Sequence, residues 1–245
     1  MTRQSSAQAS AQEARRRQIA ANLSEVHDRI ASACRTSGRL PEQVRLAVVT
    51  KTFPASDVEI LAELGCTDVA ENRDQEARDK FAAVGPATGL RWHMIGQLQR
   101  NKVKSVAGWA DVVESVDRSE IAHALSHAAA TRDRVLDIHI QVSLDPIFTA
   151  GRGGVDPAQA EALALEILAL PGLRLTGVMG VAPHPGDPVR AFALLADVLQ
   201  RLQQVHPACT QMSAGMSQDL EEAIGAGATQ VRIGGAVLGN RPELK

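Results

Sequence analysis

The sequence has 245 residues, of which 44% are hydrophobic and 22% charged, and its net charge of −2 gives no argument for a nucleic-acid or membrane-surface partner. The length fits one α/β barrel or one large doubly wound domain, and no apolar run approaches the roughly 18 residues of a membrane span. Three cysteines lie far apart, without metal-type spacing and without a secretory segment, which favours a cytoplasmic protein with reduced thiols.

The amino-terminal region divides into two parts. Residues 1–10 are small and polar, and we expect them to be disordered. Apolar residues then recur at helical spacing and predict an amphipathic helix before the first strand; they are Ile19, Leu23, Val26, Ile30 and Ala33. We expect this helix and the rest of the chain, residues 11–245, to form one domain.

The first strand is an apolar run that ends in a lysine. Ala47 and Val49 share one face of this strand, and Lys51 continues that face because side chains alternate along a strand. The carboxyl end of a buried parallel strand is where α/β folds place their chemistry, and a desolvated lysine amine can form a Schiff base. The alternative is a lysine at a strand end that extends into solvent.

After Lys51 the pattern alternates between strands and helices. Short apolar runs predict seven further strands, at residues 68–70, 91–96, 111–115, 135–144, 173–181, 209–212 and 230–235. Helical patterns separate them, and one of these helices is expected to open at Asp156-Pro157 with Asp156 as its cap. Eight such units predict a single (β/α)8 TIM barrel with an extra amino-terminal helix, and a doubly wound sheet is the alternative.

Two loops near the carboxyl end of the sequence are rich in serine and glycine. One contains Ser213 and Ser217, with Ser217 placed as a helix N-cap, and the other contains Gly234 and Gly235 after the eighth strand. The loops after strands seven and eight of a barrel often bind phosphate through backbone N–H groups and a helix amino terminus. Ordinary turn chemistry explains either loop alone about as well, but both together favour a phosphate site.

Arg232 is expected to point into the barrel. It alternates with Val231 and Ile233, which would face the surrounding helices. A buried arginine needs a partner, which is either a ligand atom or an acid such as Glu71.

Histidines and the remaining cations give weaker signals. His123 and His127 lie four residues apart on a predicted helix, but without a His-Glu-x-x-His pattern an exposed helix face explains them better than a metal site. His93 lies near a strand end, where it lines the pocket or packs in the core. Arg100, Lys102 and Lys104 are interpreted as a solvated helix face.

Several motifs occur together in one order along the chain. They are Thr50-Lys51-Thr52, Glu71-Asn72-Arg73, the run from Trp92 to Lys102, Gly215-Met216-Ser217-Gln218-Asp219 and Val231-Arg232-Ile233-Gly234. With these motifs the sequence closely resembles the YggS/PROSC-type pyridoxal phosphate homeostasis proteins, from about residue 19 to the end. The resemblance implies a barrel like the amino-terminal domain of bacterial alanine racemase.

The same resemblance implies a cofactor and its ligands. Pyridoxal 5′-phosphate (PLP) is expected as an internal aldimine on Lys51. By the family pattern the other cofactor-binding residues are Asn72 and His93 in the pocket wall, Ser213, Ser217, Gly234 and Gly235 around the phosphate, and Arg232 at the pyridine nitrogen. No catalytic residue and no metal are implied, and the implied partners are PLP and apo forms of PLP enzymes. We expect a monomer or a weak homodimer that binds neither nucleic acid nor membrane.

The sequence departs from the family pattern at three places. Ala70 replaces a usual glycine before Glu71, and Arg152-Gly153-Gly154 replaces a usual Lys-Ser-Gly. Gly235 stands where threonine or serine is common, so we expect weaker contact to the phosphate there. Backbone N–H groups can still serve at this position.

Three functions are compatible with these features. The first is a PLP-binding carrier or regulator, and the second is a PLP-dependent amino-acid racemase or another fold-type III enzyme. Racemisation needs a base on each face of the substrate, and the tyrosine that serves one face in alanine racemases is missing, because the sequence contains no tyrosine. The third is an aldolase that uses a lysine Schiff base without cofactor, and an absorption spectrum would separate it from the other two.

Overall fold

The structure, a computed structural model, describes residues 2–145 and 153–240 and has a closed barrel of eight parallel strands. Neighbouring strands pair in sequence order, and β8 pairs with β1 through Leu46 and Val231. The strands are β1 (Arg45–Val49), β2 (Asp68–Glu71), β3 (Arg91–Met94), β4 (Val112–Val116), β5 (Leu136–Gln141), β6 (Leu173–Met179), β7 (Gln211–Ser213) and β8 (Gln230–Ile233). The predicted TIM barrel is confirmed, and the doubly wound alternative is excluded because an open sheet would leave β1 and β8 apart.

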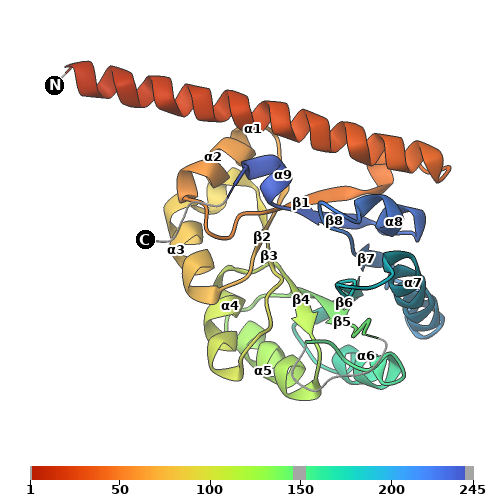
Figure 1. Cartoon of the computed structure of the whole chain (residues 1–245). Coiled ribbons are helices and arrows are strands. Elements are labelled where there is room, and N and C mark those ends of the chain that lie inside the picture. Colours follow the sequence, from red (N-terminus) through yellow and green to blue (C-terminus); the bar gives the residue numbers. More distant parts are fainter. Residues whose placement is uncertain (1, 146–152, 241–245) are drawn as a thin grey trace.

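Helices surround this barrel (Figure 1). They are α1 (Thr2–Thr36), α2 (Ala55–Glu63), α3 (Asp74–Val84), α4 (Val103–Trp109), α5 (Ser119–Ala130), α6 (Ala160–Leu168), α7 (Pro188–Val205), α8 (Leu220–Gly225) and α9 (Gly235–Leu238). Short 3-10 helices are η1 (Pro41–Gln43), η2 (Pro86–Thr88) and η3 (Arg100–Lys102). No helix in residues 2–145 and 153–240 combines the length and the apolarity needed to cross a membrane.

Alternation along the strands separates two environments. Val48, Val69 and Val231 point outward and belong to the main hydrophobic core between the sheet and the helices. Ala47 and Val49 point inward and form a small separate apolar cluster with Ala70 and Ile95. Much of the rest of the barrel interior is polar, which positions titratable side chains beneath the carboxyl ends of the strands.

Helix α1 lies along one side of the barrel, beside α2, α8 and α9 (Figure 1). The predicted apolar face is confirmed, since Ile19, Leu23, Val26, Ile30 and Ala33 are all buried. The expectation of disorder over residues 1–10 differs from the structure, in which the helix begins at Thr2. The segment contains alanine and glutamine, which have high helix propensity, so it can extend a helix that the barrel already anchors.

Two predicted helix starts are wrong. Asp156 does not cap α6, which begins at Ala160; its carboxylate accepts a hydrogen bond from the Ala158 N–H at 2.8 Å within a preceding turn. Ser217 does not cap α8, because that helix begins at Leu220 with Asp219 at the cap position. In both loops an aspartate side chain stabilises a local turn, and the helix begins two or three residues later in the chain than predicted.

Candidate functional site

A cavity of about 430 Å³ lies at the carboxyl ends of the strands. It is formed by the segments that follow β1, β3, β6, β7 and β8, which is the arrangement that gives TIM barrels their binding sites. Five of the residues predicted from the sequence line it: Lys51, Ser217, Arg232, Gly234 and Gly235. Ser217 and Arg232 lie 166 and 181 positions after Lys51 in the sequence and share the cavity wall with it, because each ends or follows a parallel strand.

The loop that carries Lys51 has an unusual backbone. Thr52 has a φ of +70°, a left-handed conformation that is rare for a β-branched residue and typical of constrained functional sites. Its backbone N–H donates to the carboxylate of Glu76 on α3. On the other side of Lys51, the carbonyl oxygen of Thr50 accepts a hydrogen bond from Lys80 Nζ at 2.6 Å. The backbone is thus fixed immediately before and after Lys51.

Lys80 also forms the centre of a buried ion pair. Its Nζ lies 2.7 Å from Glu71 Oε1 and 2.7 Å from Glu76 Oε1, and the Glu71 side chain is fully buried. Burial raises the pKa of Glu71, against the opposing effects of Lys80 and of the hydroxyl of Thr50, which donates to Glu71 Oε1 at 2.6 Å. Because Lys80 is the partner of Glu71, the ion pair between Arg232 and Glu71 that the sequence left open is not the one that forms.

Arg232 points inward from β8, as its alternation with Val231 and Ile233 predicts. It is 4% exposed, and its guanidinium donates to Ser213 Oγ at 2.6 Å and to the carbonyl oxygen of Gly180 at 2.8 Å. Burial lowers the pKa of Arg232, and the nearby Glu114 and Asp219 oppose this effect. The side chain is therefore anchored inside the barrel and forms the floor of the cavity.

Ser213 and His93, for which the resemblance implies contact with the cofactor, are not among the residues that line the cavity. The Ser213 hydroxyl is fully buried and donates to Glu114 Oε2 at 2.5 Å while it accepts from Arg232. His93 lies deeper in the barrel, between Glu114 Oε1 at 2.6 Å and Asp68 Oδ1 at 2.9 Å. His93 lies one inward-facing position below Ile95 along its strand, whereas Ser213 is the last residue of β7.

Asn72 lies beside the cavity and is not part of its wall. Its side chain is exposed, and its carbonyl oxygen touches Gly96, where a Cβ would lie only 2.0 Å from it. Only glycine allows this close approach of the loops after β2 and β3.

Glycines also shape the cavity beside β8. A Cβ on Gly234 would lie 3.1 Å from the carbonyl oxygen of Val49, so the loop runs close to β1. At Gly235 a Cβ would meet no atom within 4 Å. The absence of a serine or threonine at residue 235 therefore has no steric cause. Gly235 is the first residue of α9, and the first N–H groups of a helix lack partners within that helix.

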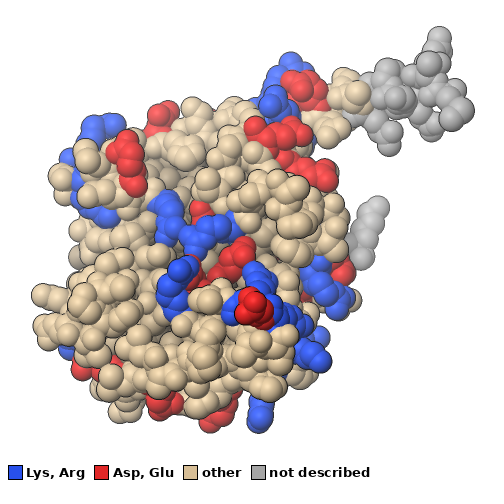
Figure 2. All heavy atoms as spheres, turned by 180° about the vertical axis from the view of Figure 1, so that it is seen from behind, with Lys and Arg blue, Asp and Glu red and all other residues tan. Residues whose placement is uncertain are grey.

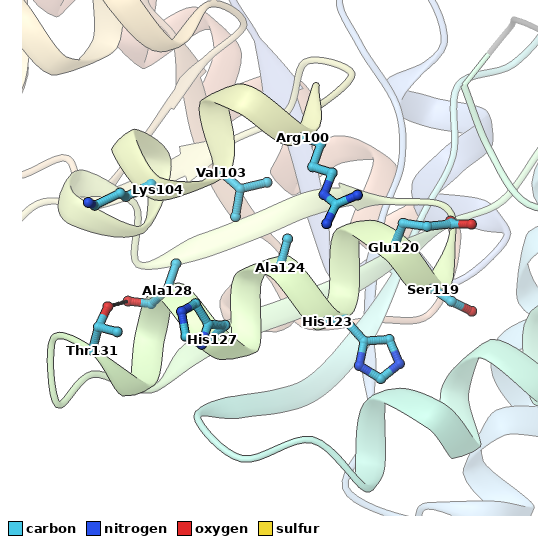
Figure 3. A pocket seen from close by; sticks show the side chains of 10 residues that line it. All are labelled: Arg100, Val103, Lys104, Ser119, Glu120, His123, Ala124, His127, Ala128 and Thr131. Carbon is cyan, nitrogen blue, oxygen red and sulfur yellow. Dashed lines mark hydrogen bonds between the residues drawn. The ribbon is translucent and has the colours of Figure 1, made fainter.

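A groove of about 650 Å³ between α4 and α5 lies away from this cavity. It contains the histidines and cations that were interpreted from the sequence as exposed helix faces: His123, His127, Arg100 and Lys104. His123 and His127 stand apart along α5 and do not converge on one point (Figure 3). Arg100 and Lys104 border the same groove from the side of α4. In the described part of the chain, no group of three His, Cys, Asp or Glu side chains could hold a metal ion.

Charges of both signs are interspersed on the face of the molecule seen in Figure 2. At the amino-terminal ends of the strands, Asp137 pairs with Arg91 at 2.7 Å and with Arg174 at 2.6 Å. Paired charges of this kind belong to the end of a TIM barrel that serves stability, opposite the cavity.

The family described as alanine racemase, N-terminal domain, matches residues 15–242. The pyridoxal phosphate homeostasis protein of Mycobacterium tuberculosis is 39% identical over 237 residues, which cover 89% of this chain and 91% of that protein. The protein of the same name from Escherichia coli K12 is 37% identical over 233 residues, which cover 93% of this chain and 98% of that protein.

This chain belongs to the pyridoxal phosphate homeostasis protein family. Among solved structures, PipY of Synechococcus elongatus PCC7942, with PLP bound, matches with a TM-score of 0.79 and 31% identity, covering 91% of this chain and 100% of that chain. The family resemblance inferred from the motifs is thereby confirmed, and it extends over nearly the whole barrel.

Several residues that shape the site of this family member were missed from the sequence. Glu76 and Lys80 are spaced i,i+4 on α3, which indicates an ion pair, but nothing in the sequence directs that pair toward Lys51. Glu114 lies in the apolar run of β4 and is fully buried. The signal available in the sequence was that Glu114 occupies an inward-facing position of a strand, because a buried acid needs a charged or hydrogen-bonding partner inside the barrel.

Proposed function

We propose that this chain binds PLP in the cavity above Arg232, as a Schiff base on Lys51, and acts as a carrier or regulator in PLP homeostasis. The observation that carries the proposal is that Lys51, Arg232 and both serine- and glycine-containing loops line one cavity. Further support comes from the relatives of that name and from PipY, which is solved with PLP bound.

The cavity residues fit the parts of PLP one by one. PLP supplies an aldehyde, which condenses with a lysine amine, and Lys51 is the lysine at the cavity wall. Ser217 offers a hydroxyl and the backbone at Gly234 and Gly235 offers N–H groups, and these are donors that suit a phosphate. Arg232 can donate a hydrogen bond to the pyridine nitrogen from its anchored position.

Three other residues take indirect roles in this proposal. Ser213 and His93 act through Arg232 and the barrel interior, because their polar atoms are already bonded to buried partners. Asn72 sits at the edge of the site, where its backbone supports the loop that carries Ile95 and Gly96.

A carrier fits the site better than an enzyme for two chemical reasons. The sequence has no tyrosine to act as the second base of a racemase. Arginine has a pKa above about 12, so it donates a hydrogen bond to the ring nitrogen without protonating it, and the ring remains a weak electron acceptor. In this proposal the protein is a cytoplasmic monomer or weak homodimer, and its partners are apo forms of PLP enzymes that receive the cofactor.

Borohydride reduction of the PLP-loaded protein, followed by peptide mapping, is expected to find the pyridoxyl group on Lys51. The variant Lys51→Ala should lose the absorption band of the bound cofactor, whereas Lys104→Ala, in the groove between α4 and α5, should keep it. A pyridoxyl group on Lys80 or Lys104 in place of Lys51 would overturn the site. A protein that takes up no PLP would leave the cofactor-free aldolase as the better hypothesis.

Amino acids added to the PLP-loaded protein are expected to be neither racemised nor decarboxylated at enzymatic rates, which are on the order of 1 to 10³ per second. Chiral chromatography of each L-amino acid after incubation measures this. Turnover at such rates would refute the carrier role. If His184→Ala then abolished the turnover, the missing base would be this histidine, which lies at the cavity wall.

A further inference from the structure

A chain of buried polar side chains crosses the barrel interior below Arg232. Glu114 is its centre: Oε2 accepts from Ser213 at 2.5 Å, and Oε1 accepts from Gln230 Nε2 at 2.6 Å and contacts His93 Nδ1 at 2.6 Å. On the far side of His93, Nε2 lies 2.9 Å from Asp68 Oδ1. All of these side chains are nearly inaccessible to solvent.

Geometry fixes the charges in this chain. Both ring nitrogens of His93 face carboxyl oxygens, and the lowered pKa values of Asp68 and Glu114 keep those groups ionised, so both nitrogens carry hydrogen and the ring is an imidazolium. Burial alone lowers the pKa of His93, but the hydrogen bonds and charges of Asp68 and Glu114 outweigh it and raise the pKa. Two carboxylates, Asp68 and Glu114, thus face two buried cations, His93 and Arg232, and Asp68 also lies 3.8 Å from the guanidinium of Arg91. Removal of Glu114 leaves Arg232 and one side of His93 without this compensation.

The Ser213 hydroxyl transmits this arrangement to Arg232. A hydroxyl has one hydrogen, and Ser213 donates it to Glu114. Its oxygen is therefore turned toward its two donors, Arg232 Nη1 at 2.6 Å and Gln230 Nε2 at 3.1 Å. Without the Glu114 carboxylate the hydroxyl could rotate and direct its hydrogen at the guanidinium instead. Glu114 also attracts Arg232 directly, since Oε2 lies 3.9 Å from Nη1.

We propose that Glu114 is the positioning residue for Arg232: through the Ser213 hydroxyl and its own charge it holds the guanidinium so that the remaining N–H groups face the cavity. The inference rests on the proposed function, because the ligand group that Arg232 would meet is the pyridine nitrogen of PLP. Glu114 already compensates the charge of Arg232, so this end of the cavity favours a neutral acceptor such as that nitrogen. The phosphate is left to the loops at Ser217 and Gly235.

A double-mutant cycle tests whether Glu114 acts through Arg232. Glu114→Gln is expected to raise the dissociation constant of PLP by about tenfold or more, the loss of one charge-assisted hydrogen bond. In the Arg232→Ala background the same change should alter it by less than about twofold. Ser213→Ala should also raise the dissociation constant of PLP. Because this variant keeps the Glu114 carboxylate, it provides the test if Glu114→Gln fails to fold. Asp68→Asn is the matched control, because it also removes a carboxylate partner of His93 and does not contact Arg232.

The outcomes separate this inference from the function on which it rests. The inference would be overturned if Glu114→Gln weakened PLP binding equally with and without Arg232, or if Asp68→Asn weakened PLP binding as much as Glu114→Gln does. Either result would show that Glu114 acts through general stability. A second readout needs no cofactor: the Nη1 protons of Arg232, which donate to Ser213, should exchange slowly by NMR in the PLP-free protein and should lose this protection in Glu114→Gln. If the wild type takes up no PLP yet shows this loss, the proposed function fails and the positioning role stands. Unchanged protection in Glu114→Gln would refute the positioning role of Glu114.

Discussion

Lys80→Met is expected to lower the free energy of unfolding by about 3 to 5 kcal/mol, the usual cost of removing one partner from a buried ion pair. Lys80 is the cation that compensates Glu71, whose side chain is fully buried. Within the described residues, Oε2 of Glu71 has no hydrogen-bond partner at all, so the carboxylate depends on its other oxygen and on Lys80. Methionine fills a similar volume without a charge, and the loss therefore reports the charge itself.

Urea denaturation measures this loss, and two further variants interpret it. Lys104→Met, on the exposed side of α4, should change the unfolding free energy by no more than about 0.5 kcal/mol. Lys80→Met combined with Glu71→Gln should recover part of the stability, because a neutral pair leaves no buried charge. If Lys80→Met lowers the free energy of unfolding by no more than Lys104→Met does, the ion pair does not stabilise the loop that carries Lys51. The Thr50 carbonyl and the Glu76 carboxylate both lose their bond to Lys80 Nζ, so the positive φ of Thr52 should also relax.

The charged chain formed by His93, Glu114 and Asp68 is expected to contribute most to the free energy of unfolding between about pH 4.5 and 6.5. The pKa of His93 is raised above its ordinary 6.5, so its contribution is complete below pH 6.5 and is lost as the pH rises through the folded value. The pKa of Glu114 is lowered from 4.5 and that of Asp68 from 3.8, because the charge and hydrogen bonds of His93 overcome the effect of burial. Their contributions are complete above these ordinary values and are lost in acid.

Unfolding curves for the wild type and His93→Gln across this pH range test the assignment. The wild type should lose stability above pH 6.5 more steeply than the variant, in which no imidazolium can be neutralised. His123→Gln, on the exposed side of α5, should follow the wild-type curve. Parallel curves for the wild type and His93→Gln would mean that His93 is neutral in the folded protein, against its two carboxylate contacts.

Recognition of the barrel from the sequence succeeded because the signals are local. Period-2 alternation in β8 placed Arg232 inside and Val231 outside, and the apolar run of β1 placed Lys51 at a strand end. Helix starts were less predictable. At Asp156 and Ser217, capping residues stand at the expected places, but competing turns held by aspartate side chains displaced the helices.

By itself the sequence determined the fold, the family and five of the residues that line the cavity, because each depends on neighbours within a few positions or on a motif. Only the tertiary structure decided which buried charges meet. Ser213 bonds to Glu114 across 99 positions and Gln230 bonds to it across 116, so no local pattern relates them. The same holds for the positions of His93 and Ser213, which are not among the residues that line the cavity. Their depth depends on the register of neighbouring strands, and register is fixed only when the barrel closes between β8 and β1.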